Sequence, residues 1–228
     1  MSNGTPAGTI RRPAVPRPIR IRRSVRSLGE NDPILTYYGK AIAEMKKKLI
    51  ANPLSWRYQA AIHDYDPGDD PSSSSSDVLP TDQATYWSAC QHASWFFLPW
   101  HRMYLHHFEK MIMSEVMELG GPEDWALPYW NYSEASPESR ILPKAFQKSS
   151  TTGLYVPQRA ANANAGLQFA GTSETNISDC LSEPLFTGVP SGSPGFGGLP
   201  GLSHNPRPGK GMLERSPHDR MQFPRLQN

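Results

Sequence analysis

The sequence predicts a mainly α-helical domain with long irregular connections and a short N-terminal strand. Two segments, 33–51 and 99–119, carry apolar residues at the three- and four-residue spacing of an amphipathic helix. The 23 prolines and 18 glycines gather in an N-terminal arm, a serine-rich loop and the last third of the chain. Because these residues interrupt helices and strands, we expect a helical bundle smaller than the 228 residues would allow.

Positive charge dominates the N-terminal arm, residues 1–23. Residues 1–29 hold seven arginines and no acidic residue. Aromatic side chains are absent here, which favours a flexible solvated arm over a nucleic-acid-binding one, so no nucleic-acid partner is expected. The alternation in IRIRRSVRSL, residues 19–28, predicts the short strand at a sheet edge.

Neither a membrane span nor an export signal is expected. The chain has no run of 18 apolar residues, the shortest that would indicate a membrane helix. No apolar stretch follows Arg11 and Arg12, so we expect a cytoplasmic location. Two cysteines do not make a disulfide framework, and Cys180 is expected to be an unpaired thiol.

The first two helices follow from local signals. One is expected to begin at Pro33, after a possible cap at Asp32, and to run to about residue 51. Its apolar face comprises Leu35, Tyr38, Ile42, Met45 and Leu49. A shorter helix within 53–63 should present His63 at its end, before a flexible loop at 66–82.

The stretch CQHASWFFLPWHRMYLHHFE, residues 90–109, is the most informative part of the chain. On one straight helix, nine residues at about 100° each would carry His101 to the face opposite His92. Pro99 is tolerated in the first turn of a helix and disfavours helical angles at Leu98. The sequence therefore predicts that His92 ends one element and His101 lies in the first turn of the next.

That next helix is expected over 99–119, until two glycines and Pro122 end it. Its apolar stripe comprises Trp100, Tyr104, Phe108, Met111, Ile112 and Val116. His106 and His107 follow His101 by five and six positions and are rotated away from it, which favours surface positions. Residues 125–130 are expected to form a short buried turn.

Histidines from three places point to a metal centre. Imidazole is the commonest protein ligand for copper and zinc, and His63, His92 and His101 could bind one ion. Three protein ligands with an open fourth position are typical of reactive metal sites rather than structural ones. Four aromatic residues would keep water from the ion: Trp95, Phe96, Phe97 and Trp100.

Several motifs in order resemble the tyrosinase copper-binding family, which includes tyrosinases, catechol oxidases and haemocyanins. The resemblance is carried by SWRYQAAIH at 55–63, the C-x-H start, FLPWHR, YLHHFEK, ALPYWNY, RILPKAF at 140–146, GFGG at 195–198 and GMLERSPHD at 211–219. It implies a helical-bundle copper domain over residues 24–219, with the copper A region at 55–119. It also implies copper as the cofactor, with O2 and a small phenol as partners.

In this family the matching residues would have defined roles. His63, His92 and His101 would bind the first copper ion, copper A. Cys90 lies where many members join a cysteine to a ligand histidine through a thioether, here His92. Phe97 and Trp100 are expected in the core, although the family also uses aromatic residues near this position to wall the site. Arg102 directly follows His101 and is a candidate for pairing with an acidic residue such as Glu109 or Glu214, between which the sequence does not decide.

The second site of the family, copper B, matches only in part. His218 stands in the expected motif, but Gln222 occupies the position of the next ligand, and the chain stops at Asn228. An amide oxygen is a weak copper ligand compared with imidazole. We therefore expect a chain truncated within the copper B region, with residues 220–228 as a non-matching tail.

The resemblance implies an oxidoreductase that converts phenols or catechols to quinones with O2. The incomplete copper B site leaves open whether this chain is an enzyme, and it favours a catalytically inactive copper-binding fragment as the alternative. A haemocyanin-like oxygen binder is a second alternative. A zinc hydrolase is disfavoured because no carboxylate base stands near the three histidines in the sequence. The sequence does not indicate an oligomeric state.

Overall fold

The computed structural model describes residues 19–66, 73–90, 97–148, 150–171, 175–178 and 181. Helices and irregular loops make up this part of the chain, and its only pairing of extended backbone consists of two isolated bridges. The helices are α1 (Pro33–Lys47), α2 (Trp56–His63), α3 (Gln83–Tyr86), α4 (Phe97–Glu118) and α5 (Ala161–Asn164), with 3-10 turns at Val25–Ser27, Pro137–Arg140 and Lys144–Phe146. The predicted mainly α-helical class is confirmed.

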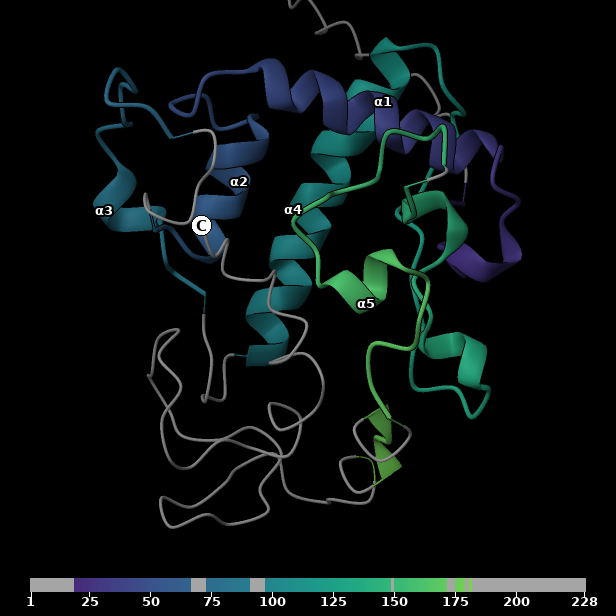
Figure 1. The fold of residues 1–228 in the computed structure, drawn as a ribbon. Coiled ribbons are helices and arrows are strands. Elements are labelled where there is room, and N and C mark those ends of the chain that lie inside the picture. The colour runs from purple at the N-terminus through teal and green to yellow at the C-terminus, as the bar shows by residue number, and fades with distance from the viewer. Residues whose placement is uncertain are drawn as a thin grey trace, which may run out of the picture.

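Helix α4 is the longest element and runs through the middle of the described structure, as Figure 1 shows. Helix α1 crosses the end of α4 that carries its last residues, and α2 lies beside α4. The larger of two apolar clusters in the described residues forms where α1 meets α4. Its main members are Leu35, Ala41, Ile42, Met45, Phe108, Ile112, Val116 and Trp125.

Helix α1 begins as predicted and ends earlier. The Asp32 carboxylate accepts a hydrogen bond from the Ile34 amide at 2.9 Å, and Pro33 takes the first helical position. The helix stops at Lys47, so the prediction that Leu49 lies on its buried face is wrong: Leu49 is 80% exposed. The chain turns between α1 and α2, and the amide of Asn52 donates to the Leu49 carbonyl in this turn.

Helix α4 starts at Phe97 in the described residues, two residues before the predicted start. The expectation that Leu98 has non-helical angles is therefore wrong, although Pro99 still lies near the start of α4 as described. Proline is tolerated there because the first turn has no partner for its missing N–H.

The predicted stop of α4 is confirmed. Gly120 has a φ of +73°, and its amide donates to the Met117 carbonyl at 3.0 Å. The Gly121 amide donates to the Val116 carbonyl at 2.8 Å. This pair of bonds is the Schellman arrangement, which satisfies the last carbonyls of the helix.

The predicted N-terminal strand is wrong. Residues 19–28 contain one parallel bridge, between Ser24 and Tyr129, followed at once by the 3-10 turn. The side chains of Arg22 and Arg23 form ion pairs with Glu109 and Asp32, so they anchor the segment through charge rather than through a sheet ladder. Trp125 and Ala126 are buried as predicted, but the predicted turn at 125–130 is wrong: the turn lies at 123–124, and Tyr129 is exposed.

None of the helices described here has the length and apolar character that crossing a bilayer would require.

Candidate metal centre

Three potential metal ligands converge between α2 and the start of α4. The nearest donor atoms of His63, Cys90 and His101 all lie within 4.8 Å of one another. Cys90 is fully buried, and the two histidines are partly buried. The rings of His63 and His101 are 5.6 Å apart between centroids and nearly perpendicular. The predicted convergence of these two histidines is therefore present in the fold.

His63 is the last residue of α2, as the sequence predicted. The helix begins because the Ser55 hydroxyl accepts the Tyr58 amide at 3.0 Å, which satisfies one of the free N–H groups of the first turn. The His63 ring packs against Trp100 and Tyr104 of α4, at centroid distances of 6.2 and 6.3 Å. Aromatic contact with α4 thus fixes the direction of this imidazole.

Cys90 is held beside His63 by the backbone. The amides of Ser88 and Ala89 donate to the carbonyls of Ala61 and Ile62 at 2.8 and 3.0 Å. These carbonyls belong to the last turn of α2, where no partner is available within the helix. Ser88 takes a φ of +52°, an uncommon conformation for a residue other than glycine, to make this turn.

Aromatic packing also holds the segment before Cys90 in place. Trp87 lies against Tyr58 and Tyr65, at centroid distances of 5.7 and 4.4 Å. Tyr58 belongs to α2 and Tyr65 follows it, so the indole clamps the segment before Cys90 onto the helix that carries His63.

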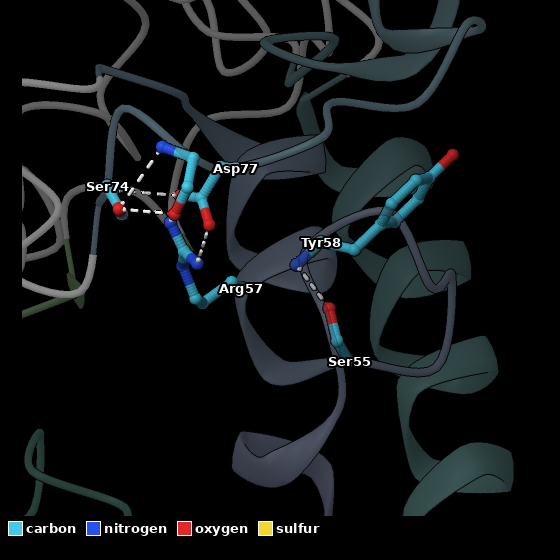
Figure 2. A network of polar contacts seen from close by, with 6 residues as sticks. Ser55, Arg57, Tyr58, Ser74 and Asp77 are labelled. Carbon is cyan, nitrogen blue, oxygen red and sulfur yellow. Dashed lines mark hydrogen bonds and ion pairs between the residues drawn. The ribbon is translucent and has the colours of Figure 1, made fainter.

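An ion pair joins the loop before α3 to helix α2. Figure 2 shows the Arg57 guanidinium reaching the Asp77 carboxylate, with a shorter contact of 2.6 Å and a longer one of 3.3 Å. The Ser74 amide donates to the same carboxylate at 3.0 Å. The hydrogen bond from Arg57, followed by that from Ser74, lowers the pKa of Asp77.

One ring nitrogen of His101 is committed to the backbone. Its Nδ1 lies 2.7 Å from the Phe97 carbonyl oxygen, which can only accept, so Nδ1 carries the proton. Nε2 is then the unprotonated nitrogen, and it lies 3.2 Å from the Cys90 sulfur. A backbone carbonyl that orients a histidine in this way is typical of metal ligands.

Tyr104 ties the two ligand-bearing helices together. Its hydroxyl donates to the backbone carbonyl of Gln59 at 2.7 Å, and the Gln59 side-chain Nε2 donates to the Pro53 carbonyl at 2.6 Å. Burial, with a smaller contribution from the nearby Cys90 sulfur, raises the pKa of Tyr104 well above its ordinary value. The phenol therefore stays protonated and remains a donor to α2.

The predicted surroundings of the site are met in part. Phe97 and Trp100 contact the His101 ring at centroid distances of 4.4 and 5.0 Å, as expected for aromatic residues that line the metal site. Arg102 is exposed, and of its two candidate partners, Glu109 bonds to Arg22, whereas Glu214 lies outside the described residues.

Several predicted positions lie outside the described residues: His92, Trp95, Phe96, Cys180, Glu214 and His218. The proposed thioether between Cys90 and His92 is therefore untested. His106 and His107 are exposed, as expected. Sequence reasoning missed the contact between Cys90 and His101 and the role of Tyr104 as a link; only the helical spacing from His101 could have indicated the latter.

With this geometry in view, the comparisons identify the class of protein. Residues 53–192 match the family model described as the common central domain of tyrosinase. The chain belongs to this family, whose members are copper proteins. The donor set is compatible with copper, because two imidazoles and a thiol are ligands that this metal accepts.

Individual relatives agree with this assignment. The chain is 33% identical over 217 residues to tyrosinase HcTyr1 from Hahella sp. strain CCB-MM4, covering 88% of this chain and 46% of that protein. It is 30% identical over 139 residues to the chloroplastic catechol oxidase B of Solanum tuberosum, covering 56% and 22%. The chain thus spans less than half the length of these two relatives.

Solved structures share the fold. The latent apple tyrosinase matches with a TM-score of 0.56 and 27% identity, over 90% of this chain and 43% of that one. The polyphenol oxidase of Grenache (Vitis vinifera) matches with a TM-score of 0.56 at 24% identity, over 91% and 60%, which supports the fold alone.

Proposed function

We propose that this chain is the copper A-bearing part of a type-3 copper oxidoreductase that oxidises phenols or catechols with O2. The observation that carries the proposal is the convergence of His63 and His101 within a chain of the tyrosinase family. The named activities of relatives, tyrosinase and catechol oxidase, support the reaction class.

The proposed ligands of copper A are His63, His92 and His101. When bound, copper would supply a redox-active centre that exchanges electrons with O2. The residues around it have separate tasks. The Phe97 carbonyl holds the His101 tautomer that leaves Nε2 available, and the Tyr104 hydroxyl keeps the two ligand helices in register. Trp100 makes edge-type ring contacts with both imidazoles, at centroid distances of 6.2 Å to His63 and 5.0 Å to His101.

His218 is the proposed remaining ligand of copper B. Because Gln222 stands where the next imidazole is expected, this chain would need further ligands for a complete pair of ions. The alternative is an inactive copper-binding fragment, and the observation that favours it is Gln222 at the position of the next copper B imidazole.

Copper stoichiometry measured together with catechol oxidation tests the proposal. We expect bound copper that is lost in His63→Ala and His101→Ala and kept in the double variant His106→Ala, His107→Ala. Two copper ions per chain with quinone formation would support the oxidoreductase, and one ion without turnover would support the fragment. Copper binding that survives both single variants would contradict the proposal.

A further inference from the structure

We propose that Cys90 is itself a metal ligand and contributes one sulfur, beside the imidazoles of His63 and His101, to the site that binds Cu(I). This inference rests on the proposed function, in which the chain binds copper here. It adds a donor that the family resemblance does not supply, because the resemblance implies a thioether from Cys90 to His92 rather than a bond from sulfur to the metal.

Distances between the donor atoms support a shared ion. Bonds of about 2.0 Å to nitrogen and 2.3 Å to sulfur put neighbouring donors roughly 3.3–3.7 Å apart around one ion. The Cys90 sulfur and His101 Nε2 are 3.2 Å apart, and all three donors lie within 4.8 Å of one another. A movement of about 1 Å, within the reach of side-chain rotation, would bring the set to bonding geometry.

The protonation pattern is that of a site ready to exchange a proton for a metal ion. Since His101 Nδ1 donates to the Phe97 carbonyl, the Cys90 thiol is the donor in its contact with Nε2. Binding of Cu(I) would break the S–H bond, form a bond between sulfur and copper, and release the proton to solvent. No electron is transferred, because copper enters in its reduced state.

The position of the sulfur is fixed before any ion binds. The two backbone bonds from Ser88 and Ala89 to the end of α2 hold Cys90, which is fully buried. A thiolate is a soft ligand, and soft ligands select Cu(I). The nearby Tyr104 hydroxyl does not compete for the sulfur as a hydrogen-bond donor, because it donates to the Gln59 carbonyl instead.

The test is competition for Cu(I) between the full chain and a chromophoric chelator, without oxygen. The key variant is Cys90→Ser, and its matched control is Cys180→Ser, which removes the other thiol. Replacing a ligand should cost more than the roughly 10–100-fold that outer residues contribute, so we expect a loss of at least about 100-fold in Cys90→Ser only. X-ray absorption of the copper-loaded wild type should detect one sulfur ligand, which does not depend on how well the variant folds.

Three results would overturn the inference. In the first, Cys90→Ser binds Cu(I) as tightly as Cys180→Ser, whereas His63→Ala binds it more weakly. That result would support the proposed function and contradict the sulfur ligand. In the second, the purified chain is lighter by two hydrogens and Cys90 resists alkylation without metal, as a thioether would require. In the third, His63→Ala and His101→Ala keep full affinity, and both proposals would fail.

Discussion

The two ends of α4 differ in what surrounds them. Its last turns contribute Ile112 and Val116 to the apolar core against α1, and both are fully buried. Its first turns carry His101 and Trp100, which are only partly buried. Hydrophobic burial therefore positions one end, whereas a few hydrogen bonds and ring contacts position the other.

This difference indicates how the metal centre depends on the rest of the fold. The core supplies the free energy of folding, since each fully buried large apolar side chain contributes about 1.5–3 kcal/mol. The centre depends on single polar links, each worth roughly 0.5–1.5 kcal/mol net. Variants in the core should change stability most, and variants at the links should change metal affinity with little loss of stability.

The largest effect is expected for Trp125→Ala. Trp125 is fully buried in the core, and its indole N–H donates to the Ile34 carbonyl at 3.0 Å. Removing the ring should lower the free energy of unfolding by about 3–5 kcal/mol. Denaturant unfolding would measure this, with Trp56→Ala, which is partly buried, as a milder comparison. An equal loss in both variants would refute the contrast between buried and peripheral rings.

Gly39→Ala should have the next largest effect. A Cβ at this position of α1 would lie 1.7 Å from the Thr152 carbonyl oxygen, so the segment that carries Thr152 must move away. We expect a loss of about 1–3 kcal/mol from overpacking. Gly29→Ala is the matched control, because its Cβ would meet nothing within 4 Å. Equal melting temperatures for the two variants would rule out this close approach.

Tyr104→Phe should separate stability from metal binding. The variant keeps the ring and loses the bond to the Gln59 carbonyl, at a cost of about 1 kcal/mol. Because that bond holds α2 against α4, we expect copper affinity to fall by up to about tenfold. Tyr86→Phe, at an exposed position, is the control. Unchanged copper affinity in Tyr104→Phe would mean that the link does not position the ligands.

The smallest effect is expected at Asp77, and it should depend on pH. The pKa of Asp77 is lowered in the folded state, so its ion pair with Arg57 stabilises the protein above the unfolded value of about 3.9. This stabilisation is lost as the pH falls through the folded pKa. Wild type and Asp77→Asn should therefore differ at pH 7 and converge in acid. A difference that grows in acid would have the wrong sign.

The sequence predicted the elements whose signals are local. Asp32 and Pro33 mark the start of α1, and the glycines after Leu119 mark the end of α4, because caps act within a few residues. His63 at the end of α2 followed from the same kind of signal. These features depend on neighbouring residues only.

The sequence did not predict contacts between distant segments. Arg22 pairs with Glu109 across 87 positions, and Glu109 was one of the two candidate partners of Arg102. Likewise, the contact between the Cys90 sulfur and His101 Nε2, 3.2 Å apart, joins residues on different segments and was not predicted. Tertiary packing decides such pairings, and a single sequence carries no signal for them.

The most direct test of the account is anomalous X-ray scattering at the copper edge from a crystal of the full chain grown with Cu(I). We predict a copper peak within bonding distance of both His63 and His101. A peak only at the exposed His106 and His107, or none at all, would contradict the central claim that these two imidazoles share one metal ion.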